Sequence, residues 1–229
     1  AGVDDQTTPK TIICPHDDYA YAGSVYYSCL KPCKAPLLIL IGVAHKAYKY
    51  NMENTAVFET FDYWAGPYGN VPVSKYRDSL LKIVPENLVT VHDSLHIDEH
   101  SLEALIPFLQ YFNRDIEIIP ILIPFSTFEV MDSVSQALAQ GLKKIAEKNK
   151  LKWGKDFAIV ISNDAVHYGD KDWGGRNYAK YGTDVVGYNE AVNHEHEIID
   201  NTLSGEISKE KVQSFISYTT EEEDFKAYK

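Results

Sequence analysis

The sequence predicts an α/β fold with three layers, in which a mostly parallel central sheet carries helices on both faces. Its strand-like segments are almost continuous apolar runs, which is typical of parallel strands buried on both sides. These runs alternate along the chain with segments whose apolar residues recur at helical spacing. With 229 residues, of which 45% are hydrophobic and 24% charged, the chain is long enough to bury a substantial core.

Four segments are predicted to be strands because they are short, apolar and rich in β-branched residues. They cover residues 11–14 (TIIC), 37–43 (LLILIGV), 116–123 (IEIIPILI) and 157–161 (FAIVI). Pro120 lies inside the third segment and has no backbone N–H to donate. It therefore predicts that this strand lies at an edge of the sheet or contains a bulge.

Five segments show the apolar spacing of helices. They cover residues 79–84, 98–112, 130–148, 183–203 and 208–216. In the second of them, Asp98 is expected to cap the helix and Pro107 to kink it. Residues 53–72 are rich in aromatic and turn-forming residues and predict a short strand followed by a long loop, which is either functional or a solvated excursion.

Composition narrows the class of protein and its location. The net charge of −11 argues against nucleic acid as the partner, because phosphate binding needs clustered Lys and Arg. No apolar run approaches the roughly 20 residues that span a bilayer, so no membrane partner is expected. Three cysteines without a disulfide or zinc-binding pattern predict a cytoplasmic protein. No linker divides the chain, so residues 1–229 are expected to form one domain.

Histidines follow three of the predicted strands at their C-terminal ends. His16 comes two residues after the first strand, His45 two after the second, and His167 a few residues after the fourth. Because the carboxyl ends of parallel strands lie at one edge of a sheet, these side chains are expected to meet in one crevice. We interpret His16 and His45 as metal ligands, although a histidine after a strand also serves as a loop hydrogen-bonding group.

Other polar side chains near these histidines are expected to support the site. Asp164 and His167 are candidate catalytic residues, with a capping pair as the alternative. His100 is a third candidate, placed at the start of a predicted helix with Glu103, and a capping arrangement is its alternative. His96 lies in a polar loop; it is expected to be solvated, or else to line the pocket.

Four motifs in this order resemble those of the Memo family, which includes the AmmeMemoRadiSam system protein B proteins. Residues 15–23 (PHDDYAYAG) are similar to the family's PHAGYxYSG, and residues 42–45 (GVAH) to its GPSH. Residues 98–109 match the pattern EHSlE…lPFL, and residues 161–169 match SSDxxHxG. The resemblance covers about residues 11 to 170.

The resemblance implies the fold of class III extradiol dioxygenases (LigB-like) and a site that holds iron or copper. The family's two histidine ligands correspond to His16 and His45. His167 matches an acid/base histidine of the related dioxygenases, and His100 falls in the family's EHS motif near the pocket. The resemblance also implies a functional link to a radical-SAM protein.

This sequence departs from the family pattern at two places. Asp17 and Asp18 replace a small Ala-Gly pair before Tyr19, which puts two carboxylates beside a ligand in the predicted pocket. The family's third ligand is a C-terminal cysteine, and no cysteine follows Cys33 here, so the domain is expected to lack the family's C-terminal segment.

Three functions remain open on the sequence. The first is a non-haem redox metal enzyme that acts on a small substrate. The second is a zinc hydrolase in which Asp17 or Asp18 is the base. The third is a non-catalytic module that binds a peptide or a metal ion. The identity of a small-molecule or peptide ligand is left open by the sequence.

Overall fold

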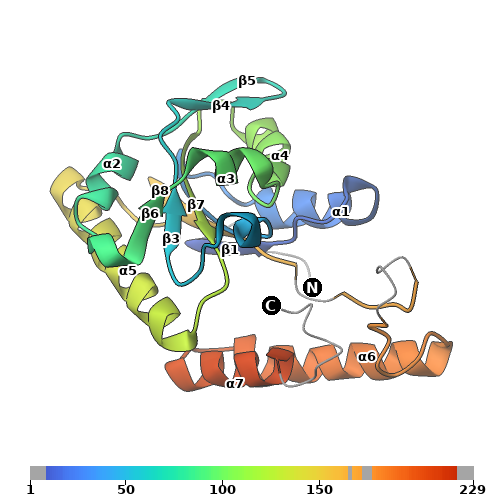
Figure 1. The fold of residues 1–229 in the computed structure, drawn as a ribbon. Helices are drawn as coiled ribbons and strands as arrows, with labels where there is room; N and C mark the ends of the chain where they lie inside the picture. Colours follow the sequence, from blue (N-terminus) through green and yellow to red (C-terminus); the bar gives the residue numbers. More distant parts are fainter. Residues whose placement is uncertain (1–8, 165–166, 172–176, 221–229) are drawn as a thin grey trace. The chain divides into compact units, whose positions relative to one another are not determined.

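The structure is a computed structural model that describes residues 9–164, 167–171 and 177–220 (Figure 1). The chain forms two compact units, Ala1–Asn163 and Asp164–Lys229, which are described separately. The single domain over residues 1–229 stays a prediction.

The first unit is built on a sheet of six strands in the order β1-β8-β2-β7-β3-β6. Its strands are β1 (Thr11–Cys14), β2 (Leu37–Val43), β3 (Ala56–Phe58), β6 (Val89–Val91), β7 (Glu117–Ile123) and β8 (Phe157–Ser162). Every neighbouring pair is parallel except β3 and β7, which are antiparallel. The mostly parallel sheet predicted from the sequence is confirmed.

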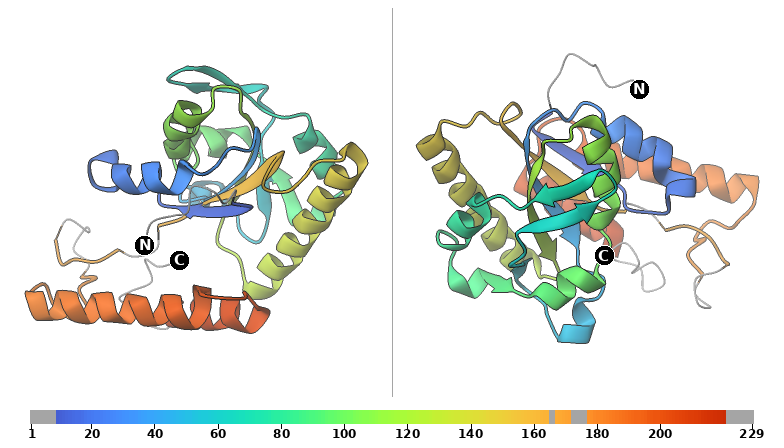
Figure 2. Two further views of the ribbon diagram at one scale, coloured as in Figure 1. Left: turned by 180° about the vertical axis from the view of Figure 1, so that it is seen from behind. Right: turned by 90° about the horizontal axis from the view of Figure 1, so that it is seen from above.

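Helices cover both faces of this sheet. On one face lie α1 (Tyr19–Leu30) and α4 (Ile106–Phe112), and on the other lie α2 (Tyr76–Leu81) and α5 (Phe128–Asn149) (Figure 2). Shorter helices are α3 (Asp93–Asp98), η1 (Ala47–Tyr50), η2 (Glu86–Leu88) and η3 (Glu103–Leu105).

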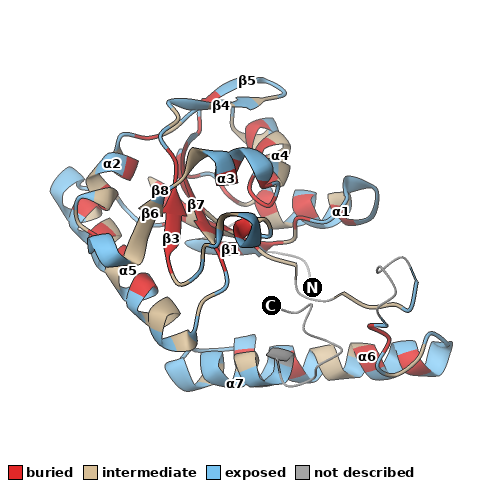
Figure 3. Cartoon of the chain, viewed as in Figure 1, coloured by how far each residue is buried: buried red, intermediate tan, exposed pale blue. Residues whose placement is uncertain are grey.

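Two apolar cores result, one on each face. Along β2, Leu38 and Leu40 face the core under α1 and α4, whereas Leu37 and Ile39 face the core under α2 and α5. The strands are accordingly the most buried part of the unit (Figure 3). Burial on both faces explains why these strands have no apolar–polar alternation, and it confirms the three-layer α/β prediction.

Pro120 does not mark an edge strand, so that part of the prediction is wrong. The strand β7 lies inside the sheet, between β2 and β3. The side of β7 towards β3 is paired only in places: Ser74 N–H donates to the Ile118 carbonyl, and Val57 pairs with Leu122. Pro120 lies between these two points, where its missing N–H removes no hydrogen bond of the described ladder.

The helix predicted over residues 98–112 forms only in its later part, and its predicted start at Asp98 is wrong. Asp98 ends α3 and caps nothing, and Glu99 is extended with φ −101° and ψ 140°. A turn, η3 and then α4 follow. Pro107 lies in the first turn of α4, where a missing N–H costs nothing, so it produces no kink. The side chain of Glu99 binds the backbone N–H groups of the next two residues, which replaces helical hydrogen bonding there.

Residues 53–72 form more regular structure than the predicted long loop. After β3 the chain makes a hairpin from β4 (Tyr63–Gly66) and β5 (Gly69–Pro72). Gly69 has φ +113°, a conformation that side chains with a Cβ rarely adopt, and it makes the tight turn possible. Turn residues were recognised in the sequence, but the flanking strands are too short for a clear alternation.

The second unit contains α6 (Val185–Ile198), a π-helical turn η4 (Ile199–Leu203) and α7 (Lys209–Thr220). Asp184 caps α6 by accepting a hydrogen bond from Gly187 N–H at 2.8 Å. These elements confirm the helices predicted over residues 183–203 and 208–216. Among the described residues, the helices are all too short or too polar to cross a bilayer. The cytoplasmic location stays a prediction.

Candidate metal centre

The pairing of the strands aligns their C-terminal ends. Ser162 at the end of β8 pairs with Cys14 on one side and with Gly42 on the other. His16 follows Cys14 by two residues, and His45 follows Gly42 by three. The parallel register therefore delivers both histidines to the same level of the sheet edge, as predicted.

The two rings meet through their Nε2 atoms. The Nε2 atoms of His16 and His45 are 3.3 Å apart. The ring of His100 stacks on that of His45 with centroids 5.0 Å apart, and it lies edge-on to His16 at 5.7 Å. One ligand nitrogen from each of the three residues lies within 4.8 Å of the others, so the group can hold a metal ion.

Glu99 fixes the protonation of His45. Its Oε1 lies 2.9 Å from Nδ1 of His45, and a carboxylate only accepts hydrogen bonds. His45 therefore carries its proton on Nδ1, and its Nε2 keeps a free lone pair.

Ser162 does the same for His16. Its hydroxyl donates to the carbonyl of Ser101 at 2.5 Å, so its oxygen is left to accept from Nδ1 of His16 at 3.0 Å. His16 is 4% exposed and is thus held in one tautomer inside the protein. In this tautomer the Nε2 of His16 carries no proton.

Two nitrogens without protons consequently lie 3.3 Å apart. Neutral imidazoles in these tautomers form no hydrogen bond with each other, and a cation between them relieves the repulsion. Two nitrogens each about 2.0–2.1 Å from one ion lie at most about 4.2 Å apart, so the spacing fits a shared metal. Imidazole nitrogens are good ligands for iron, copper and zinc.

The carboxylate of Glu99 is buried, with 1% of its side chain exposed. Burial alone raises the pKa of this carboxyl. The hydrogen bond from His45, together with those from the N–H groups of His100 and Ser101, outweighs burial and lowers the pKa to about 2. A permanent negative charge therefore stands behind His45, which makes its Nε2 a better electron-pair donor.

Asp17 and Asp18 are engaged in local hydrogen bonds at the start of α1. The carboxylate of Asp18 accepts from Ala20 N–H at 2.8 Å and caps the helix. Oδ1 of Asp17 accepts from Asp18 N–H at 2.7 Å, and its carbonyl accepts from the hydroxyl of Tyr26. Their exposed carboxylates lie beside His16 in the sequence; a role in the pocket stays a prediction.

Tyr19 joins α1 to the segment that carries His100. Its hydroxyl donates to the carbonyl of Ala104 at 2.8 Å, next to Glu103. Burial, and then the charge of Glu103, raise the pKa of Tyr19. The hydrogen bond thus links α1 to the segment that follows His100. Direct roles for Tyr19 and Glu103 in the site stay predictions.

His96 is buried rather than solvated, so the expectation of a solvated side chain is wrong. Its Nε2 hydrogen-bonds the carbonyl of Val57 at 3.1 Å, and its ring lies edge-on to Trp64. Burial lowers the pKa of His96 to about 4. The polar residues around it in the sequence concealed that it is an inward-facing residue of the short α3.

Asp164 and His167 belong to the second unit. Nε2 of His167 lies 3.8 Å from Oδ2 of Asp164, which places the two residues as a pair. Their assignment to catalysis stays a prediction.

Three residues of the centre were not proposed from the sequence as site residues: Glu99, Ser101 and Ser162. Each fixes a histidine, directly or through another residue. A signal was present, because Ser162 ends a strand whose partners lead to His16 and His45, and Glu99 precedes His100. Only the folded backbone brings Glu99 to His45, which is 54 positions away.

The chain is similar to proteins described as Memo-like. The family model for the Memo-like protein matches residues 1–224. A MEMO1 family protein of Aquifex aeolicus is 32% identical over 163 residues, which cover 70% of this chain and 55% of the relative. One of Metallosphaera sedula is 29% identical over 164 residues, covering 70% and 54%.

The chain thus spans about half the length of the curated relatives it matches. A third, from Saccharolobus solfataricus, is 30% identical over 162 residues, which cover 68% of this chain and 52% of the relative.

Proposed function

The chain belongs to the Memo family, and we propose that its histidine centre binds iron or copper for redox chemistry on a small substrate. The observation that carries the proposal is the close approach of two ligand atoms, because Nε2 of His16 and Nε2 of His45 lie 3.3 Å apart. Each histidine is held in place by a hydrogen bond that its Nδ1 donates, from His45 to Glu99 and from His16 to Ser162.

His16, His45 and His100 are the residues that would hold the ion. When bound, iron or copper supplies Lewis acidity and one-electron redox chemistry. The buried His16 is the rigid member of the group, whereas the His100 side chain is 56% exposed and can adjust to a substrate. Glu99 balances positive charge at the centre, because it stays ionised at neutral pH.

Proton transfer in this proposal is assigned to His167, with Asp164 as the carboxylate that orients it. Their 3.8 Å separation within the second unit supports a pair of this kind. His100 is the alternative proton carrier, since its Nδ1 lies 3.2 Å from Oε1 of Glu99.

The zinc hydrolase is the weaker candidate. It needs a carboxylate base, but Asp18 caps α1 and Asp17 binds the backbone of Asp18. Both carboxylates are therefore already engaged in hydrogen bonds at the start of α1. Among the described residues, no contact favours the third candidate, a non-catalytic module that binds a peptide or a metal ion.

Metal content tests the proposal. The full chain, purified without oxygen and analysed for elements, should contain iron or copper near one ion per chain. His16→Ala and His45→Ala should each lose the ion and remain folded. His92→Ala, which removes a helix cap and a ring contact with Tyr50, should retain it. Zinc alone would overturn the redox proposal, and no metal in the unaltered chain would overturn the centre itself.

A further inference from the structure

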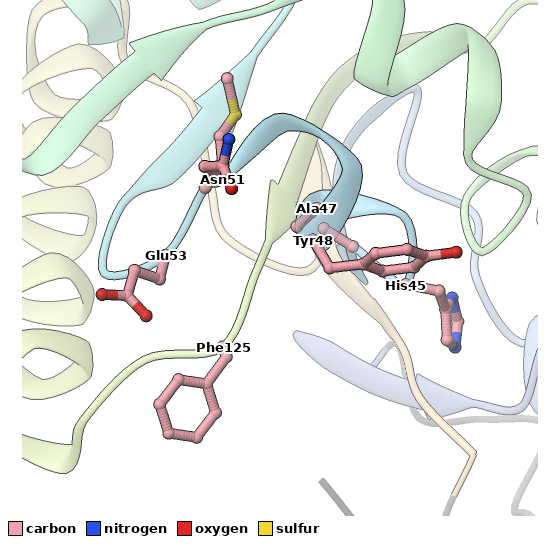
Figure 4. Close-up of a pocket in the computed structure, with 8 residues that line it drawn as sticks. His45, Ala47, Tyr48, Asn51, Glu53 and Phe125 are labelled. Carbon is pink, nitrogen blue, oxygen red and sulfur yellow. The ribbon is translucent and has the colours of Figure 1, made fainter.

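A pocket of about 560 Å³ opens beside the histidine centre (Figure 4). It lies between η1, the segment after η1 and the segment after β7, and His45 forms part of its wall. The other side chains used below are Tyr48, Glu53 and Phe125. Its volume is within the range of sites for small organic molecules.

Backbone hydrogen bonds hold the pocket in shape. Asn51 ends η1 with φ 51°, and Asn54 has φ 58°, a left-handed conformation that asparagine tolerates better than most residues. Asn54 N–H donates to the Phe125 carbonyl at 2.9 Å, and Thr127 N–H donates to Oδ1 of Asn54 at 2.9 Å. The segments that carry Glu53 and Phe125 are therefore hydrogen-bonded to each other in the protein without a ligand.

The walls expose two aromatic rings to solvent. Tyr48 is 72% exposed and Phe125 is 58% exposed, and both line the same hollow. Aromatic side chains are common in the walls of sites for small organic molecules, where they pack against flat rings. Met52 adds a flexible apolar side chain to the wall.

One negative charge lies at the pocket. Glu53 is exposed and makes no ion pair or side-chain hydrogen bond within the part of the chain that the structure describes. The nearby Lys49 is already paired with Asp98 at 3.2 Å. In Figure 4 the Glu53 carboxylate lies on the side of Phe125, and His45 lies on the side of Tyr48.

We propose that this pocket binds a small molecule with one aromatic ring and a protonated amino group. The ammonium group pairs with Glu53, the ring lies against Phe125 and Tyr48, and the end opposite the amine lies at His45. The inference rests on the proposed function in one respect, because the metal centre is what would act on that end of the molecule. It names the substrate class of that centre.

Tyramine and 4-methylphenol are the probes, since they share a phenol ring and tyramine carries a protonated aminoethyl group where 4-methylphenol carries a methyl group. The full chain is titrated with each by calorimetry, as purified and again after chelation of its metal. Tyramine should bind about three- to fivefold more tightly than 4-methylphenol, which is the size expected for an exposed charge pair. Glu53→Gln should abolish that preference, and Glu86→Gln, an exposed carboxylate elsewhere, should preserve it.

Tyr48→Ala should weaken both probes, because it removes part of the wall and nothing from the core. Equal binding of the probes, no tyramine binding, a preference unchanged by Glu53→Gln, or a preference lost on chelation would each overturn the inference. A chain that prefers tyramine but contains no redox metal would leave this inference standing and overturn the proposed function.

Discussion

Replacing Glu99 by Gln should weaken metal binding by about 10- to 100-fold, the usual cost of altering a residue that orients a metal ligand. The carboxylate accepts hydrogen bonds from Nδ1 of His45 and from three backbone N–H groups. An amide is nearly the same shape, so the change tests charge and hydrogen bonding rather than packing.

The expected loss of folding free energy in Glu99→Gln follows from the same contacts. Oε1 faces three donors, and Oε2 faces Lys46 N–H at 3.2 Å. If the amide oxygen of the variant takes the place of Oε1, its NH₂ group is directed at the Lys46 N–H, donor against donor. One buried donor left without an acceptor costs about 1–3 kcal/mol. His45 also loses its charged partner, because a neutral amide oxygen replaces the carboxylate.

The assay has two readouts. Competition with a chelator of known affinity gives the metal dissociation constant, and urea unfolding of the metal-free chain gives the free energy of unfolding. Glu86→Gln is the matched control, because Glu86 is exposed on η2. Metal affinity within about threefold of the unaltered chain would refute the idea that Glu99 holds His45 ready for a metal.

Four further substitutions have distinct expected results. Gly42→Ala should destabilise the fold by about 1–3 kcal/mol and lower metal affinity, because its Cβ would lie 2.6 Å from Ser101 Oγ. Gly23 lies in a helix with open space around it, so Gly23→Ala should raise the free energy of unfolding by about 0.5–1 kcal/mol. Thermal unfolding measures both changes. Ser162→Ala should weaken metal binding about 10-fold or more in the chelator assay, since His16 loses its acceptor, and unchanged affinity would contradict the tautomer argument. His96 has a folded pKa of about 4, below the unfolded value near 6.5, so the unfolded chain takes up a proton first and stability should fall by up to about 3 kcal/mol between pH 6.5 and 4. Urea midpoints of His96→Gln should show a flatter pH profile, and an identical slope would argue against a neutral buried ring.

The sheet was predictable because its strands are apolar throughout. The bounds of β1 and β2 agree with the predicted segments, and β7 and β8 agree to within one residue. This kind of pattern arises wherever both faces of a strand are buried, so it needs no knowledge of partners. The short strand β6 has three residues and no such pattern, and it was not predicted.

The site was predictable only as far as strand ends determine it. His16 and His45 follow directly from the rule that parallel strands end at one edge. His100 was expected near the pocket for a wrong local reason, because it lies in a turn and not at the start of a helix. Its position beside His45 depends on the extended Glu99, whose side chain competes with helix formation, and single-residue propensities do not reveal that competition.

The short segment from Glu99 to Ser101 supports both strand-end histidines from one place. It reaches His45 through a carboxylate, and it reaches His16 through the carbonyl that holds Ser162. A designer who grafted two strand-end histidines onto another parallel sheet would thus obtain rings without defined tautomers. The portable unit is the pair of strand ends together with this tripeptide, and transplanting all three pieces is the smallest graft we expect to work.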